Sequence, residues 1–485
     1  MNLVTVPFLA PQVRGLKESE QAILNQLIRV WQAKRPRNTL RQAYVDMKAG
    51  VDFSTVDIPA HLAANLNVVM GWPGKAVTEL ANRISWEGPL GESDQSFVLR
   101  RLLDANNFSQ EFRQSTESAL TQSLSFWVVR PSASDRDDFP MVRSYSAENA
   151  AALWDWGKRE ISAGLTVTQT NYLNVPAELH LYLPGRVLQI GMTSNSTWHV
   201  TDQAVYPFNH VPMYAMPYNP SLLRPFGRSR VNRQVMSLTD RAIRAGLRMD
   251  VSAEFYMAPF FMLLGAEQSA FEDGAGNMIP AWDWIMGHVK AISRDVDGNL
   301  PQVFQSSQQT MEPYIAQMRQ LAAEFSSATS IPVSSLGVVD TSTNSSLVFN
   351  AAREDLIIDA KNTIDTFGQV LKRVYRDALF TMDGHERFAD SYLMLDTKWM
   401  NPARPSIVSQ SDAMVKQVAA IPWLAETTVA LEELGYSSSQ IERLLVEKRR
   451  AQAGTVLDKL ASMTTPSVQV EAGKVSVDDT SQPAV

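Results

Sequence analysis

The chain has 485 residues, 45% of them hydrophobic, and a formal net charge of −7. This composition provides for about two to four domain-sized units with substantial cores and excludes a disordered chain. The absence of cysteine excludes a disulfide framework, a thiolate metal site and a cysteine nucleophile. No stretch approaches the roughly 18 uninterrupted apolar residues of a membrane span, and the first residues lack a signal-peptide pattern, so we expect a soluble, unsecreted protein.

The N-terminal part has helical periodicity. Residues 18–49 predict two helices separated at Pro36, because proline lacks the N–H that a helix interior needs. Further helical patterns cover residues 74–84, 96–105 and 109–124. This part of the chain is therefore expected to form a helical frame.

Between residues 124 and 218 the pattern changes to that of strands. Segments such as "SFWVVRP" and "ELHLYLPGRVLQIGM" alternate apolar and polar residues or are rich in β-branched and aromatic side chains, with turn residues between them. We expect a mostly β insertion in the helical frame, which makes the fold class α+β and mainly helical.

Residues 224–250 contain seven arginines, no lysine and two aspartates. We expect a helix that starts near Arg228 or Ser229, with Ser229 as N-cap, and reaches about Met257. On this helix five arginines share one side, about 120° from an apolar stripe: Arg230, Arg233, Arg241, Arg244 and Arg248. Such a side suits carboxylates, phosphates or a second copy of the protein, or it is simply solvated.

The second half alternates between turn-rich and helical segments. Residues 260–309 carry Asp-Gly and Gly-Asn turn signals and predict a compact β-containing excursion. A helix follows at 311–328, then the small polar loop "VVDTSTNSS" and the longest helical pattern, about 33 residues or 50 Å. A last helical block follows "DTKWMNPARPS", and the residues from about 464 onward are expected to be disordered.

The sequence offers no catalytic, cofactor or metal motif. The stretch "GWPGKAV" resembles a phosphate-binding loop only in its Gly-Lys pair, because Val69 and Ala76 stand where a glycine and a Ser or Thr are needed. The six histidines have no ligand-like spacing, and "DRDD" at 135–138 is better explained as a solvated loop. We therefore expect no enzyme activity, no cofactor and no metal.

Taken in order, these blocks resemble tailed-phage portal proteins, specifically the group similar to the portal of Bacillus phage SPP1. The resemblance is carried by "WPGKAVTELANRISWEG", "VPMYAMPYNPSLLRPFGRSRVNRQVMSLTDRAIRAGLRMDVSAEFYMAPFFMLLG", "FSSATSIPVSSLGVV", "TNSSLVFNAAREDLIIDAKNTIDTFG", "DTKWMNPARPSIVSQSDAMVKQV" and "LEELGYSSSQIERL". It spans about Leu40 to Arg450. Two features depart from the family: "APFFML" lacks the polar residue common after that proline, and the C-terminal helical block is short.

The resemblance implies a non-enzymatic ring, usually of twelve subunits, at one capsid vertex of the virion, assembled in the host cytoplasm. Double-stranded DNA is packaged and ejected through it, and its partners are the terminase large subunit, a head–tail adaptor, the major capsid protein and possible scaffold. The implied regions are an N-terminal wing part (1–228), first stem helix (229–259), clip (260–309), second stem helix (310–328), tunnel-loop region (329–345), long helix and wing closure (346–396), crown (397–463) and tail (464–485).

Within these implied regions, three sets of residues are expected to carry the function. The tunnel loop facing DNA comprises Asp340, Thr341, Ser342, Thr343, Asn344 and Ser345, and the clip docking residues are Trp282, Trp284 and Ile285. The five arginines become a subunit interface. Three alternatives stay open: a solvated connector for the loop, a DNA-binding protein that uses the arginine-rich helix 229–250, and a hydrolase with an unrecognised site.

Overall fold

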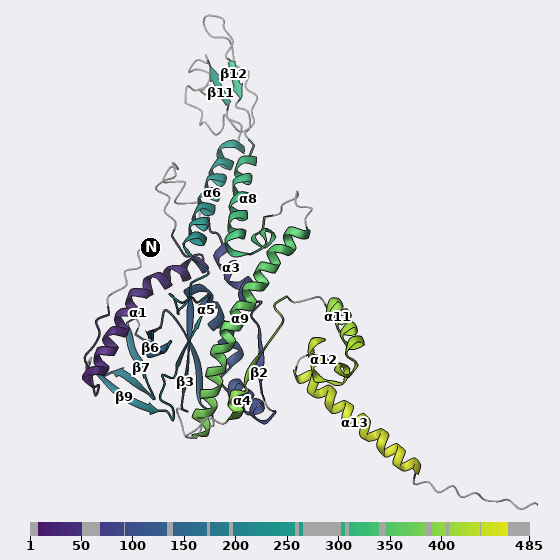
Figure 1. The fold of residues 1–485 in the computed structure, drawn as a ribbon. Coiled ribbons are helices and arrows are strands. Elements are labelled where there is room, and N and C mark those ends of the chain that lie inside the picture. Colours follow the sequence, from purple (N-terminus) through teal and green to yellow (C-terminus); the bar gives the residue numbers. More distant parts are fainter. Residues whose placement is uncertain are drawn as a thin grey trace, which may run out of the picture. The chain divides into compact units, whose positions relative to one another are not determined.

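The computed structural model describes residues 8–50, 68–91, 93–132, 139–171, 175–193, 197–257, 261–264, 302–305, 310–338, 346–384, 390–403, 407–436 and 438–463. The chain divides into a large unit, Met1–Ala403, and a small unit, Arg404–Val485. A run of consecutive strands separates two groups of helices (Figure 1), so the expected α+β, mainly helical class is confirmed. Within the described ranges, no helix is both long and apolar enough to cross a membrane.

The first helix, α1 (Glu18–Val45), is continuous, so the predicted break at Pro36 is wrong. Both sides of the proline are fixed to the same neighbouring turn: Trp31 Nε1 donates to the Glu148 carbonyl at 2.6 Å, and Asn38 Nδ2 donates to the Ala147 carbonyl at 3.0 Å. These contacts, together with the burial of the Trp31 ring, hold the helix on either side of its missing backbone hydrogen bond.

The β segment expected at 124–218 is present and folds into two sheets. In the described residues the strand orders are β1-β9-β8-β7-β6-β5 and β10-β3-β4. The first sheet packs on α1 through buried Leu24, Ile28, Leu165 and Ile190. The strands are β1 (Val13–Arg14), β3 (Leu124–Arg130), β4 (Met141–Ser146), β5 (Ala150–Asp155), β6 (Glu160–Thr170), β7 (Pro176–Leu183), β8 (Arg186–Met192), β9 (Trp198–Val205) and β10 (Met213–Pro217).

The core of the second sheet is built against the long helix α9 (Ser346–Asp383). Its buried Phe367 and Tyr375 join a cluster with Trp127 of β3, and Trp86 Nε1 donates to the Tyr375 hydroxyl at 2.7 Å. Three short helices complete this layer: α3 (Trp72–Ala81), α4 (Ser93–Ala105) and α5 (Phe108–Gln122).

The boundary between the two units lies later than predicted. Strand β13 (Asp396–Trp399), which follows the short α10 (Asp390–Leu393), pairs antiparallel with β2 (Trp86–Leu90) in the large unit. The predicted crown boundary at 397 is therefore wrong, since residues 397–403 belong with the large unit. The small unit contains α11 (Ile407–Ala420), α12 (Thr428–Glu433) and α13 (Ser438–Met463).

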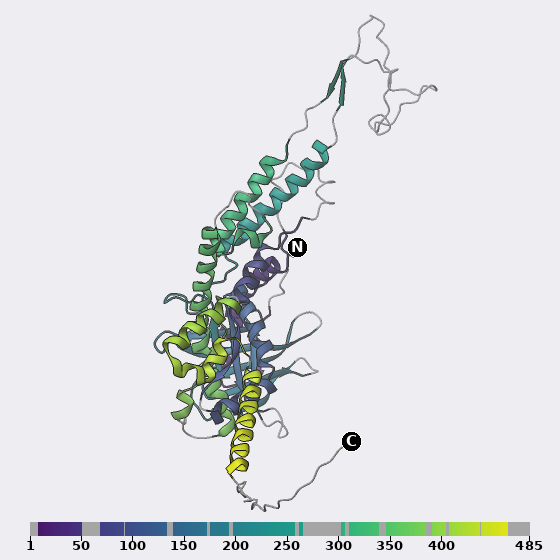
Figure 2. The ribbon, with the colours of Figure 1, turned by 90° about the vertical axis from the view of Figure 1, so that its right-hand side faces the viewer.

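Two helices that are distant in sequence lie side by side in Figures 1 and 2: α6 (Arg233–Met257) and α8 (Glu312–Thr329). Arg241 pairs with Glu324, and Ser252 Oγ donates to the Tyr314 hydroxyl at 2.9 Å, so the two helices are antiparallel. Between them in the chain, β11 (Phe261–Leu264) and β12 (Gln302–Gln305) form an antiparallel pair. The helix end expected at Met257 is confirmed.

Helix α6 starts at Arg233, so the predicted start near Arg228 or Ser229 is wrong. Asn232 occupies the N-cap position instead, because its Oδ1 accepts from the backbone N–H of Val235 at 3.0 Å. Ser229 is buried and its hydroxyl donates to the Thr121 and Val231 carbonyls. The residues before α6 therefore form a non-helical connection between β10 and α6.

That connection requires glycine at position 227. Gly227 has φ +72°, and a Cβ atom there would lie 2.2 Å from the Tyr218 carbonyl oxygen and 2.8 Å from that of Ser123. The close approach allows the N–H of Arg228 to donate to the Tyr218 carbonyl at 2.9 Å, and that of Arg230 to the Leu120 carbonyl at 2.9 Å. Only glycine combines this backbone conformation with this proximity.

Arg230 is 6% exposed and lies in this connection, not on α6. Its Nε donates to the Ala76 carbonyl at 2.8 Å, Nη1 to the Tyr218 hydroxyl at 3.0 Å and to Asp359 Oδ2 at 2.5 Å, and Nη2 to the Thr329 carbonyl. These partners come from α3, from the segment after β10, from the end of α8 and from α9. The prediction that Arg230 belongs to an exposed subunit interface is wrong, since its guanidinium is used within the chain.

Burial raises the pKa of Tyr218 to about 12, so its phenol is protonated at neutral pH. The hydroxyl accepts from Arg230 and donates to Asp359 at 2.9 Å. The side chains of Arg230, Tyr218 and Asp359 are thus all hydrogen-bonded to one another. We call these three side chains, together with the carbonyls of Ala76 and Thr329, the Arg230 joint.

We predict that Arg230→Ala lowers the free energy of unfolding of the large unit by about 3 kcal/mol, because it leaves a half-buried carboxylate and two carbonyls without their donor. Arg230→Lys should lose most of the same stability, since an ammonium group cannot reach four partners in a planar fork. Arg233→Ala is the control: its side chain is exposed, and its effect should stay within about 0.5 kcal/mol. Denaturant unfolding followed by tryptophan fluorescence measures all three, and equal midpoints for the two alanine variants would refute the role of the joint.

Candidate functional site

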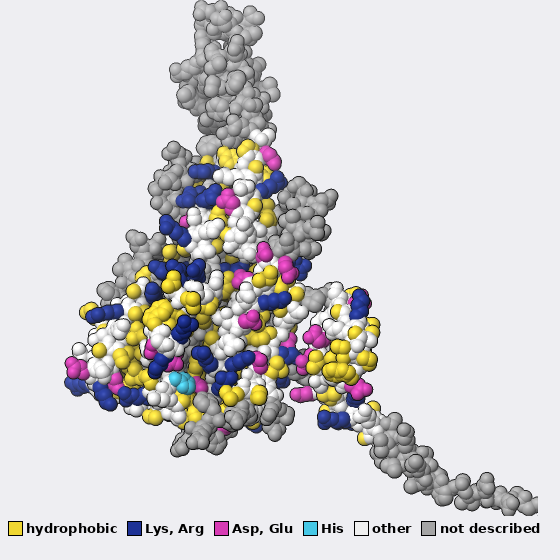
Figure 3. Space-filling view, viewed as in Figure 1, with side chains coloured by type: hydrophobic (Ala, Val, Ile, Leu, Met, Phe, Trp, Pro, Cys, Tyr) yellow, Lys and Arg dark blue, Asp and Glu magenta, His cyan; other side chains and the backbone are white. Residues whose placement is uncertain are grey.

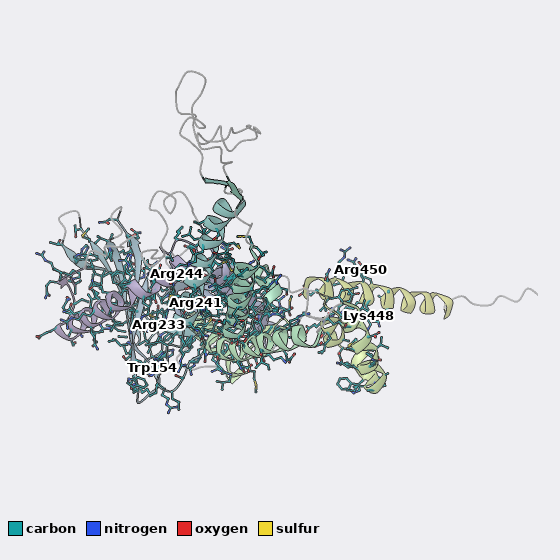
Figure 4. All side chains as sticks on the ribbon, turned by 90° about the horizontal axis from the view of Figure 1, so that it is seen from above. Trp154, Arg233, Arg241, Arg244, Lys448 and Arg450 are labelled. Carbon is teal, nitrogen blue, oxygen red and sulfur yellow. The ribbon has the colours of Figure 1, made fainter. Side chains whose placement is uncertain are left out.

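The arginine-rich side of α6 is the predicted site that the structure describes best. Arg233, Arg241 and Arg248 are exposed and Arg244 is partly buried, whereas Val235 and other apolar residues of α6 are buried. We call these four residues the arginine face. Figure 4 labels three of them, Arg233, Arg241 and Arg244. The helical period of about 3.6 residues separates this face from the apolar one, as the sequence predicted.

Two members of the arginine face already have acidic neighbours in the same chain. Arg241 Nη1 lies 2.9 Å from Glu324 Oε2 of α8, and both side chains are accessible to solvent. Arg244 lies near Asp240, which accepts a hydrogen bond from the Tyr44 hydroxyl at 2.8 Å. Burial raises the pKa of Asp240, and the Arg244 cation and the Tyr44 hydrogen bond oppose that rise. The face is therefore only partly available to an external anion.

Sequence reasoning missed two carboxylate partners of the arginines: Glu324, which pairs with Arg241, and Asp359, which pairs with Arg230. Glu324 lies on the predicted helix at 311–328, and its distance of 83 residues from Arg241 gives no local signal. Asp359 lies beside the apolar stripe of the long helix, next to the buried Leu356 and Ala360. A carboxylate at the edge of an apolar stripe is the sequence signal that favours a buried cation as its partner, because a buried charge is costly unless it is paired.

Two other predicted sites lie outside the described residues. They are the tunnel loop, with Asp340, Thr341, Ser342, Thr343, Asn344 and Ser345, and the clip docking residues Trp282, Trp284 and Ile285. Both stay predictions. In the part of the chain that the structure does describe, no group of three or more histidine or carboxylate side chains is arranged to hold a metal ion.

Two histidines, the buried His180 and the partly buried His210, form pairs with carboxylates. His180 on β7 lies 3.0 Å from Glu178, and burial together with the nearby Arg130 lowers the pKa of His180 to about 4, so its ring is neutral at neutral pH. His210, just before β10, pairs with Asp377 of α9, and burial raises the pKa of that carboxyl. The first pair lies within a sheet, and the second fastens the β segment to α9.

No protein-family model matches the chain. The chain is 22% identical to the portal protein of Mycobacterium phage L5 over 413 residues, and this match covers 83% of each chain. Over 400 residues it is 22% identical to the portal protein of Mycobacterium phage D29, which covers 80% of each.

Among solved structures, a chain in the neck of an empty gene transfer agent particle has a TM-score of 0.43 and 12% identity, over 79% of this chain and 95% of that one. A chain of the native gene transfer agent virion has a TM-score of 0.41 and 14% identity, over 72% and 86%. The two phage relatives confirm the predicted resemblance to phage portal proteins, but they do not confirm a resemblance to the SPP1-like group.

Proposed function

We propose that the chain assembles into a homo-oligomeric ring at one vertex of a phage capsid and that double-stranded DNA enters and leaves the capsid through the ring. The observation that carries the proposal is the similarity to two portal proteins over four-fifths of their length and of this chain. The order of elements agrees with it: a helix, a turn-rich excursion and an antiparallel helix are followed by a polar loop and a long helix.

In this proposal α6 and α8 are the stem, and residues 260–309 between them are the clip. Residues 1–228 and 346–403 form the wing, residues 329–345 include the tunnel loop, and the crown is revised to residues 404–463, which follow the boundary of the small unit. The remaining C-terminal residues are the tail.

The ring acts as a conduit and a docking platform and has no chemistry of its own. A separate ATPase, the terminase large subunit, supplies the work of packaging, and the clip residues Trp282, Trp284 and Ile285 dock this motor and the head–tail adaptor, because aromatic side chains favour interfaces. The major capsid protein and scaffold are further partners, and the assembled ring is a component of the virion.

A second candidate function is direct DNA binding by the arginine face. Three exposed arginines on one side of α6 favour it. Arg241, however, is already paired with Glu324, and the chain as a whole carries a net charge of −7. The arginine face is therefore proposed to meet carboxylates of a neighbouring subunit, and a measurement of particle size distinguishes this arrangement from a DNA-binding monomer.

We expect the purified protein to form rings. Twelve chains of 54.0 kDa give a particle of about 650 kDa, and negative-stain images should show a closed ring with a central channel. Mass photometry measures the size independently. A particle that stays at the mass of one or two chains, both alone and with DNA, would contradict the proposed function.

The role of the arginine face is tested by charge reversal. Arg241→Glu should weaken the association constant of each interface about tenfold, which corresponds to about 1.4 kcal/mol per interface, and so reduce the fraction of chains in rings. The double variant Arg241→Glu/Glu324→Arg restores an ion pair within the chain but not one with a neighbour, so it should remain defective. Arg113→Glu on α5, another exposed arginine with a carboxylate partner in its own chain, is the control. Full recovery of rings in the double variant would show that Arg241 acts only within its own chain.

The tunnel loop is tested by adding a positive charge. Thr343→Lys places one cation per subunit, and hence a circle of cations in the ring, where the wild-type loop has small uncharged residues beside Asp340. Each cation recruits a phosphate contact, so we expect normal ring assembly but slowed or stalled DNA packaging, more severe at low than at high salt. Packaging at the wild-type rate across a salt series would mean that the loop is not at the constriction.

A further inference from the structure

A basic cavity of about 950 Å³ lies beside the Arg230 joint in the large unit. It is enclosed by the second half of α1, the start of β3, β5 and the connection that leads into α6. Besides Arg230, six cationic side chains line it: Lys34, Arg37, Arg41, Arg224, Arg228 and Arg233. Among the lining residues the single carboxylate is Asp359, which is bound to Arg230.

These six cations are not neutralised within the described part of the chain. None of them is in an ion pair there, and the one side-chain hydrogen bond among them runs from Arg41 Nη1 to the Gln122 carbonyl at 3.3 Å. Arg41 Nε is buried without a hydrogen-bond partner. Burial and the neighbouring Arg37 cation lower the pKa of Arg41 to about 10. Like charges in a concave, partly buried site repel one another, so the cavity is stabilised by an anionic occupant.

Exposed apolar side chains lie at the rim of the cavity, and they favour a protein carboxylate over a DNA phosphate as its occupant. Trp156 and Leu223, which line the cavity, are 62% and 87% exposed. Part of the cavity wall is formed by two packed aromatic rings: Trp154, labelled in Figure 4, lies edge-on against Phe226 with ring centroids 5.5 Å apart. Tryptophan and arginine are enriched at protein interfaces, whereas a convex DNA duplex cannot enter a cavity and leaves Leu223 in water.

We propose that the basic cavity receives a carboxylate-bearing surface of a second copy of this chain. The inference rests on the proposed ring and extends it to a site outside the arginine face. Figure 3 shows Lys and Arg side chains gathered where α1 approaches the base of α6. Because the whole chain has a net charge of −7, the surface outside this cavity is more acidic than the whole. In a cyclic ring each contact joins two different surfaces, one from each neighbour. Each copy can therefore place one acidic surface in the cavity of the next copy.

The first test reverses charge in the cavity. Lys34→Glu/Arg37→Glu should reduce the fraction of chains in rings at least tenfold, while the midpoint of unfolding stays within about 2 °C of wild type because both side chains are exposed. Arg29→Glu, an exposed arginine on the same helix but outside the cavity, is the matched control and should assemble normally. Normal rings for the double variant overturn the proposal.

The second test identifies the occupant. Because the protein has no cysteine, Leu223→Cys provides a unique thiol for a benzophenone photo-cross-linker. Rings assembled from equal amounts of ¹⁵N-labelled and unlabelled chains should give mixed heavy–light cross-links to a peptide rich in Asp and Glu. Cross-links within single chains only, or to added DNA only, overturn the proposal. If the wild-type protein forms no ring at all, the proposed function fails first; if it forms rings that neither test affects, only the present inference fails.

Discussion

The hydrogen bonds of one guanidinium group determine how the large unit is put together. Arg230 connects residues 76, 218, 329 and 359, which belong to four separate segments of the chain. The start of α6, the end of α8 and the middle of α9 therefore meet at a fixed point. A planar group with five donors suits this position, because it satisfies two backbone carbonyls and a carboxylate that burial otherwise leaves without partners.

The joint also explains where the positive charge of the chain is displayed. The connection that places Arg230 inside turns at Gly227, and so presents Arg224 and Arg228 to the basic cavity. Arg233 then begins α6 and belongs to both the cavity and the arginine face. The arginine-rich segment is thus divided by the backbone into one structural arginine and two adjoining cationic surfaces, a division that a helical wheel drawn from the sequence cannot show.

Local patterns predicted what local physics determines. The β segment at 124–218, the end of α6 at Met257 and the long α9 follow from strand alternation, a nearby proline and helical periodicity. The errors concern positions where distant residues decide. Pro36 stays in a helix because contacts to residues 147 and 148 hold both sides of it, and residues 397–403 remain with the large unit because β13 pairs with a strand some 300 residues earlier in the chain. The ordered motifs identified the family although no single site did.

In the proposed ring, arginines that pair with carboxylates at contacts between subunits cannot bind the DNA that passes through. Each arginine that a carboxylate neutralises is lost as a phosphate contact, and each phosphate contact adds salt-dependent affinity that resists sliding. In the proposed ring, the arginines of the Arg230 joint, of pairs such as Arg241–Glu324 and of the basic cavity are not available to the channel wall. Under this proposal, the electrostatic attraction between subunits also reduces the affinity of the channel for the duplex, so ring assembly and DNA translocation depend on the same distribution of charge.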